Sequence, residues 1–201
     1  DSELYRRITL DPEHEDYMPS DGKTPLTKSE LEIIKWWIEK GMAVNGKKMS
    51  NIYSSTKINN VWSEPTLLDS TINIAGACTQ QPFVMANGTQ LLFSSDRKDG
   101  LGGFDLWSVT LDNNAKPIAG TVKNLGATVN TLNDEQAPYY HAPSSSLVFS
   151  SNGYVGMGGY DFFVSKGTLN NWSTPQNLGY PLNSVKDDIY FTSNGTAKNI
   201  L

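Results

Sequence analysis

Two aspartates, Asp105 and Asp161, follow glycine-rich runs of the same form, GLGGFD and GMGGYD, and their positions differ by 161 − 105 = 56, the repeat offset. A carboxylate in such a turn can accept backbone N–H groups, and its oxygens also suit Ca²⁺. We favour the hydrogen-bonded turn and expect each carboxylate to accept N–H bonds from its own loop. Gly-Gly would give the loop its backbone freedom. The predicted structural corners are Gly102, Gly103, Asp105, Gly158, Gly159 and Asp161.

Further carboxylates could contribute to a calcium site, namely Asp99 and the pairs Asp134-Glu135 and Asp187-Asp188. The two pairs occupy equivalent points of successive repeats, and repetition favours a structural role over a metal site. Calcium is therefore the less favoured cofactor, and we assign no metal ligand. Asp96 aligns with Asn152 in the next repeat, so its carboxylate has no counterpart there. We therefore expect Asp96 to tolerate alanine far better than the corner aspartates.

Residues for nucleophilic catalysis are few, because the chain has two histidines and one cysteine and lacks a G-x-S-x-G elbow. A Ser-His-Asp triad would have to use His141, and a lone histidine at a strand end more often has a structural role. Cys78 alone excludes an internal disulfide and multi-cysteine metal sites, and we expect it to be buried and inert. The sequence therefore predicts that the protein is not an enzyme, with a propeller hydrolase as a third alternative.

The charge pattern excludes one class of partner and marks a boundary. The formal net charge is −5, and no basic stripe suits a nucleic acid. No run approaches the roughly 18 apolar residues of a transmembrane segment. Residues 1–50 contain 8 basic and 10 acidic side chains, which leaves 16 − 8 = 8 and 21 − 10 = 11 for residues 51–201. We place the boundary in VNGKKMSN (44–51).

More pieces recur around the aspartates. PF (82–83) matches PY (138–139), FSS (93–95) matches FSS (149–151), NLG occurs at 124–126 and 177–179, and WSEP (62–65) matches WSTP (172–175). Short strand-like runs alternate with turn residues inside each unit, which is typical of β-propeller blades. The predicted fold is mainly β, a partial or fragmentary β-propeller of about three blades preceded by a short two-helix segment.

The unit F-[ST]-S-x-x-x-x-G-x-G-G-[FY]-D, followed by W-S-x-P-x-N-L-G, resembles the TolB-like propeller repeat of Bacteroidota envelope proteins, which is often joined to OmpA-like domains. The resemblance covers 50–201 and implies full units near 67–126 and 127–179, with partial units at 51–66 and 180–201. IYFTSNG (189–195) echoes LVFSSNG (147–153). Because a closed ring needs about four blades or more, we expect an excerpt of a longer array.

Residues 1–49 form a different segment. SELYRRI predicts a short helix, and Thr27 with Glu30 forms a capping box for a second helix over about 28–40. The order S-x-L-x-x-R-I, M-P, G-K-x-P-L-T resembles the C-terminal part of small c-type cytochrome domains of Planctomycetes and Bacteroidota. This resemblance implies that Met18 is a distal haem ligand, conditional on a C-x-x-C-H motif. The chain lacks that motif, so haem c is expected only if such a segment precedes it.

These features together favour a non-enzymatic cell-envelope protein whose blades serve as a scaffold for protein-protein interaction. The resemblances imply a periplasmic or cell-surface location associated with the outer membrane, with other envelope proteins or a membrane-associated complex as partners. The alternative is an electron-transfer c-type cytochrome subunit in which the blades are a docking module. Ser70, in DST (69–71), fits the O-glycosylation pattern of exported Bacteroidota proteins.

Overall fold

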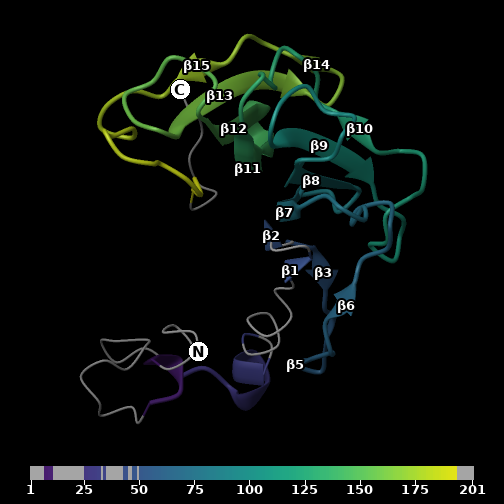
Figure 1. The fold of residues 1–201 in the computed structure, drawn as a ribbon. Helices are drawn as coiled ribbons and strands as arrows, with labels where there is room; N and C mark the ends of the chain where they lie inside the picture. Colours follow the sequence, from purple (N-terminus) through teal and green to yellow (C-terminus); the bar gives the residue numbers. More distant parts are fainter. Residues whose placement is uncertain are drawn as a thin grey trace. The chain divides into compact units, whose positions relative to one another are not determined.

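The computed structural model describes residues 7–10, 25–32, 34, 43–44, 47–48 and 50–193. It divides the chain into two units: Asp1–Met49 with Tyr53–Leu67, and Ser50–Ile52 with Leu68–Leu201. The described chain is mainly β, with several antiparallel sheets, none of which closes on itself within these residues (Figure 1). Each unit is described separately below.

Helical residues in the first unit occur at 7–8, 28–32 and 34. The capping box is present, because the Thr27 N–H donates to Glu30 Oε2 at 2.8 Å and the Glu30 N–H donates to Thr27 Oγ1 at 3.3 Å. The same contacts lower the pKa of Glu30, with the backbone hydrogen bond from Thr27 as the largest cause. Only this second helix extends beyond a single turn in the described residues, so the two-helix segment is not confirmed. Met18 lies outside the described residues.

The first unit also contains short antiparallel pairs of strands. Strand β1 (Ala43–Val44) pairs with β2 (Lys47–Lys48), β3 (Tyr53–Ser54) with β6 (Thr66–Leu67), and β4 (Lys57–Ile58) with β5 (Val61–Trp62). The serine of WSEP fastens this last hairpin, since the Thr56 N–H donates to Ser63 Oγ at 3.0 Å. The serine of WSTP does the same in the second unit, where the Lys166 N–H donates to Ser173 Oγ at 2.9 Å.

Two antiparallel sheets form the second unit. The first has the strand order β10-β9-β8-β7, from β7 (Thr79–Val84), β8 (Gln90–Ser95), β9 (Asp105–Thr110) and β10 (Lys123–Asn124). The second has the order β11-β12-β13-β14, from β11 (Glu135–His141), β12 (Ser146–Ser151), β13 (Asp161–Thr168) and β14 (Asn171–Trp172), and β15 (Gln176–Asn177) also pairs with β13. A 3₁₀ turn, η1 (Ala142–Ser144), joins β11 to β12.

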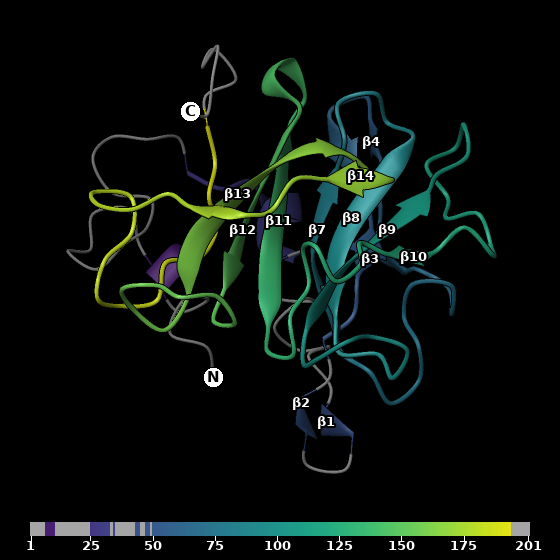
Figure 2. The same cartoon turned by 90° about the horizontal axis from the view of Figure 1, so that it is seen from above.

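The first strands of the two sheets, β7 and β11, are neighbours (Figure 2). Each contains a bulge with one residue at positive φ, Gln81 at 54° and Ala137 at 50°. The Ala137 N–H donates to Gln81 Oε1 at 2.9 Å, so the bulge of one strand is hydrogen-bonded to that of the next. The repeat is thus present in the backbone as well as in the sequence.

Hydrophobic side chains fill the space between the facing sheets. This core includes Leu92, Leu106, Leu125 and Val129 from the first sheet and its linker, and Tyr140, Leu147, Phe149, Phe163 and Trp172 from the second. The other face of the first sheet packs Leu91, Phe93, Trp107, Val109 and Leu111 against Ile52 and Ile72. Alternate residues of β8 and β9 therefore enter opposite cores, which explains the nearly continuous apolar run in β8.

An asparagine anchors each of the linkers that follow the short strands β6, β10 and β15. Asn130 Oδ1 accepts the Leu106 N–H at 2.8 Å, and Asn130 Nδ2 donates to the Leu106 carbonyl at 3.1 Å. Asn73 makes the same pair of bonds with Ile52, and Asn183 makes it with Phe162. The linker is therefore fixed to the third strand of each of the two sheets, and the segment that follows β6 is fixed in the same way to Ile52, just before β3.

Residues 189–193, the described part of the IYFTSNG run, occupy a place that the sequence similarity to 147–153 did not indicate. The Asp188 N–H donates to the Tyr160 carbonyl at 2.7 Å, as the Glu135 N–H donates to that of Phe104 at 2.6 Å. Tyr190 has φ 70°, in the position of the bulge residue. Residues 188–193 therefore follow the course of a first strand, and the match to the second strand at 147–153 was wrong. Phe-Ser/Thr-Ser alone does not distinguish the two strands.

Candidate interaction surface

The corner aspartates hold their loops as expected. Asp105 Oδ2 accepts the Leu101 N–H at 2.5 Å, and Asp161 Oδ2 accepts the Met157 and Gly158 N–H groups at 2.8 and 3.1 Å. Asn124 Nδ2 also donates to Asp105 Oδ2, at 2.7 Å. Both carboxylates are buried. Because these oxygens accept bonds from the loop, the carboxylates shape the corner of each sheet.

The corner glycines are required for close approach and not for an unusual φ, which corrects the expectation of backbone freedom. None of Gly102, Gly103, Gly158 and Gly159 has a positive φ. A Cβ on Gly102 would lie 2.5 Å from the Thr131 carbonyl oxygen. A Cβ on Gly158 would overlap with the Lys186 carbonyl oxygen. The loop of each sheet therefore packs directly on the linker that follows it.

Two glycines that sequence reasoning did not single out are equally constrained. A Cβ on Gly100 would lie 2.5 Å from Asp105 Oδ2, and one on Gly156 would overlap with Asp161 Oδ2. The glycine five residues before each aspartate leaves room for the carboxylate inside the loop. The repeat offset was the available signal, since 156 − 100 = 56.

The acidic pairs join successive sheets. Asp134 Oδ1 accepts the Phe104 N–H at 2.8 Å, and Asp187 Oδ1 accepts the Tyr160 N–H at 3.1 Å. The second member of each pair caps its own linker, since Glu135 accepts the Thr131 N–H at 2.7 Å. Asp188 likewise accepts the N–H of Ser184, at 2.6 Å. No group of three metal-ligating side chains occurs within the part of the chain that the structure describes.

Glu135 is the most enclosed of these carboxylates. Its Oε1 accepts hydroxyl bonds from Ser151 at 2.7 Å and Thr131 at 2.8 Å. Burial raises the pKa of Glu135, the charge of Asp105 raises it further, and these hydrogen bonds oppose the shift. Burial also raises the pKa of Tyr154 to about 12, with a smaller contribution from Glu135.

Asp96 has a role that the sequence comparison missed. Its Oδ1 accepts the Cys78 N–H at 2.6 Å, and Asn152 Oδ1 accepts the Asp134 N–H at 2.9 Å. Positions 78 and 134 themselves show the repeat offset, since 134 − 78 = 56. An amide oxygen and a carboxylate oxygen thus accept the equivalent bond, and the expectation that Asp96 lacks an equivalent was wrong.

The histidine that a Ser-His-Asp triad would have to use lies in a local structural contact. His141 is buried, and its Nδ1 lies 2.7 Å from Ser144 Oγ within the turn between β11 and β12. Nε2 is also buried and has no hydrogen-bond partner among the described residues. Among the residues that the structure describes, no carboxylate is hydrogen-bonded to either ring nitrogen of His141. Cys78 is buried and Ser70 is exposed.

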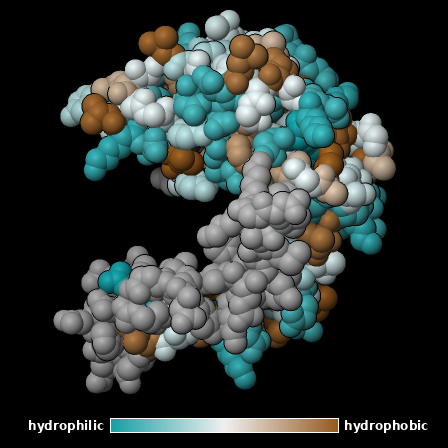
Figure 3. Space-filling view, viewed as in Figure 1, coloured by the Kyte–Doolittle hydropathy of each residue, from teal (hydrophilic) through white to brown (hydrophobic). Residues whose placement is uncertain are grey.

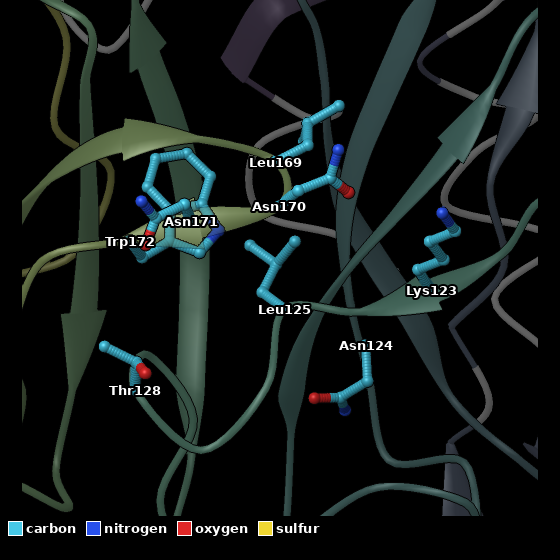
Figure 4. A pocket seen from close by; sticks show the side chains of 8 residues that line it. All are labelled: Lys123, Asn124, Leu125, Thr128, Leu169, Asn170, Asn171 and Trp172. Atoms are coloured by element: carbon cyan, nitrogen blue, oxygen red, sulfur yellow. The ribbon is translucent and has the colours of Figure 1, made fainter.

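A cavity of about 310 Å³ lies between β10 and β14 (Figure 4). Leu125, Leu169, Asn170 and Trp172 are among the residues that line it, all labelled in that view. Lys123 is its only titratable lining residue in the described structure. A single exposed cation provides neither a general acid–base pair nor an activated nucleophile. The cavity is thus a groove between the two sheets that is lined mainly by amide and apolar side chains.

Exposed apolar side chains occupy equivalent places on the corner loops and the linkers. Leu101 and Met157 share the repeat offset in the loops, 157 − 101 = 56, and Leu132 and Val185 each follow an anchoring asparagine by two residues. Leu132 is 82% exposed and Val155 is 95% exposed. Because the loops pack on these linkers, the five residues share one edge of the sheets, which we call the corner surface. Apolar groups are visible among hydrophilic ones over β13 and β15 in Figure 3.

Comparison with protein-family models, curated proteins and solved structures finds no match. Among the described residues, no helix is long and apolar enough to cross a membrane.

Proposed function

We propose that this chain is a non-enzymatic cell-envelope protein in which the stacked sheets are blades of a partial β-propeller that serve as a scaffold for protein-protein interaction. The observation that carries the proposal is the corner surface. Exposed apolar residues of this size are usually scattered singly, whereas here two pairs recur at equivalent positions along one edge. Recurrence on loops that are held by buried carboxylates supports a binding surface.

The proposed partner is another protein with an apolar contact surface. The corner surface offers aliphatic side chains and a thioether, which suit the centre of a protein interface. The polar groups beneath it are occupied in holding the loops, as Asp105 and Asp134 show. They position the apolar residues and leave few free groups for recognising a charged ligand. The envelope location rests on the resemblance to TolB-like repeats.

Site-specific photo-cross-linking in envelope preparations tests this function. A photoreactive residue at position 132 or 155 should give a discrete cross-linked species with another protein. The same residue at position 118 is the control, because Ile118 is also exposed but belongs to the β9–β10 connection. Leu132→Asp should abolish the species obtained from position 155. Equal cross-linking from position 118, or none from positions 132 and 155, contradicts the proposal.

A further inference from the structure

The cavity between β10 and β14 has a buried hydrogen-bond donor in its wall. Trp172 lines the cavity and is 8% exposed, and its Nε1 is buried without a hydrogen-bond partner among the described residues. Figure 4 shows the nitrogen of its indole on the side nearer to Leu125, another lining residue. An indole N–H only donates, and a buried donor without an acceptor needs an explanation. An acceptor placed in the cavity would supply one.

The surroundings of Trp172 hold the indole in a fixed place. Its ring centroid lies 6.0 Å from that of Tyr140 in an edge-to-face arrangement. The Tyr140 hydroxyl donates to the carbonyl of Gly167 at 3.0 Å, and Gly167 is the cross-strand partner of Trp172. The donor is therefore positioned before any ligand arrives, which reduces the entropic cost of binding.

Other polar side chains of the cavity are unused within the molecule. Asn124 is the exception, since its amide oxygen and nitrogen both form hydrogen bonds inside the first sheet and its linker. The side chains of Thr128, Asn170 and Asn171 are exposed and form no hydrogen bond with another described residue. Amides and hydroxyls donate and accept at once. They therefore suit a ligand with several hydroxyl groups, which also do both.

The charge and size of the cavity narrow the ligand further. Lys123 is exposed, forms no ion pair with the described residues and is the only charged group among those that line the cavity. One ammonium matches one carboxylate, whereas a phosphate group carries up to about two charges. A volume of about 310 Å³ suits a small molecule or one end of a chain. Strands β10 and β14 have two residues each, too short an edge to bind an added peptide strand.

We propose that this cavity binds a sugar that carries a carboxylate, either a free sugar acid or a residue of an acidic polysaccharide. The Trp172 N–H donates to a sugar oxygen, Lys123 pairs with the carboxylate, and Asn170 and Asn171 bind hydroxyl groups. Leu125 and Leu169 contact the C–H groups of the ring. The site is separate from the corner surface, so it does not depend on the proposed function.

Nuclear magnetic resonance of the full ¹⁵N-labelled chain tests the site through its indole N–H signals. The Trp172 signal is the one missing from Trp172→Phe, and sequential assignment identifies it if that variant does not fold. We expect this signal to move with galacturonate or glucuronate at up to about 10 mM, a range that includes weak affinities. Galactose, the neutral counterpart, should bind more weakly. A Trp172 signal that neither acid moves, or equal affinity for galactose and galacturonate, overturns the proposal.

Trigalacturonate distinguishes the two sources of the sugar acid. Tighter binding of the trimer than of galacturonate supports a residue of an acidic polysaccharide, and equal binding supports a free sugar acid.

A pair of exposed lysines tests the assigned charge without disturbing the core. Lys123→Gln should weaken galacturonate binding about threefold to fivefold, because an exposed ion pair contributes little, and should leave galactose binding unchanged. Lys98→Gln is the matched control, since Lys98 is exposed on the corner loop of the first sheet, and it should have no effect. Equal galacturonate affinity in Lys123→Gln and Lys98→Gln overturns the proposal.

Discussion

The sheets β7–β10 and β11–β15 have the same strand arrangement, but the place beside two aromatic rings is filled by unrelated side chains in the two sheets. In the first sheet the Arg97 guanidinium lies over Phe93 and Trp107, 5.0 and 4.9 Å from their ring centroids, and donates to the Ile72 carbonyl. In the second sheet the Tyr154 ring lies 6.4 and 5.0 Å from those of Phe149 and Phe163.

The hydroxyl of Tyr154 completes the correspondence, since it donates to the Val129 carbonyl at 3.0 Å, and Val129 is the equivalent of Ile72. The repeat offset alone would place Gly153, and not Tyr154, opposite Arg97. Gly153 is required there because a Cβ would overlap with Thr131 Oγ1. The repeat therefore preserves a contact, a flat group over two rings with one donor to the linker, and leaves the residue type free to change.

The largest effect is expected at the anchoring asparagines, which the two sheets have in common. Asn130→Ala leaves the buried Leu106 N–H without an acceptor and removes a donor from its carbonyl, so the unfolding free energy should fall by about 3 kcal/mol. Asn183→Ala should cost a similar amount. Thermal or urea unfolding measures both, with Asn170→Ala, an exposed residue of the β13–β14 turn, as the neutral control. An Asn130→Ala variant as stable as the control would show that the anchor is dispensable.

The corner aspartates should come next. Asp161→Ala leaves two N–H groups of the loop without their acceptor, at a cost of about 2 kcal/mol. Asp105→Ala should behave alike, since the two corners are equivalent. Chemical denaturation measures the loss against Asp99→Ala, which removes an exposed carboxylate beside the first corner. If Asp161→Ala and Asp99→Ala unfold at the same denaturant concentration, the hydrogen bonds contribute nothing to the corner.

A smaller loss of stability is expected at Asp96, where two substitutions distinguish the need for a hydrogen-bond acceptor from the need for a negative charge. Asp96→Ala removes the acceptor of the Cys78 N–H and should cost about 1 kcal/mol. Asp96→Asn should be nearly neutral, because Asn152 supplies an amide oxygen at the equivalent place of the second sheet. Differential scanning calorimetry of the two variants decides the point. Equal losses would mean that the negative charge, and not the acceptor, is what the first sheet needs.

The smallest effect concerns Glu135, whose counterpart in the first sheet, Thr79, does not titrate. The pKa of Glu135 is raised in the folded state by burial, so the folded state favours the protonated form. The stabilising contribution is present below the unfolded pKa and is lost as the pH rises through the raised folded pKa. The unfolding free energy of the unsubstituted chain, minus that of Glu135→Gln, should therefore fall as the pH rises from about 4.5. A difference that is constant with pH contradicts the shift.

Sequence periodicity could predict the strands and the corners because their determinants are local. The repeat offset marks Asp105 and Asp161, and these carboxylates do accept N–H groups of their own loops. The repeat offset could not predict that Arg97 and Tyr154 occupy equivalent places in the two sheets. That equivalence depends on the space beside two aromatic rings in each sheet, which residue spacing does not report. The role of Gly102 was also out of reach, because its constraint comes from the linker at 131–133, which is distant from it along the chain.

The exposed corner surface shows the same difference between what the sequence predicts and what only the structure shows. Leu132 and Val185 look like ordinary apolar residues in the sequence, and only their exposure distinguishes them from Val129. Hydropathy reports residue type and not the neighbours that bury it. The sequence does mark the anchoring asparagines, since each lies five residues after a leucine that directly follows a short strand, β6, β10 or β15: Asn73, Asn130 and Asn183.

The bond between Asp134 and the Phe104 N–H has a mechanical consequence. It joins the entry of the second sheet to the loop of the first, and Asp187 makes the equivalent bond to Tyr160. Each sheet is thus coupled to its immediate neighbour, as in a one-dimensional array with nearest-neighbour terms. Melting of one sheet would expose donors and apolar surface in the next, so disorder should spread along the chain from sheet to sheet. Under a pulling force, the linkers at 131–135 and 184–188 would be the successive points of rupture.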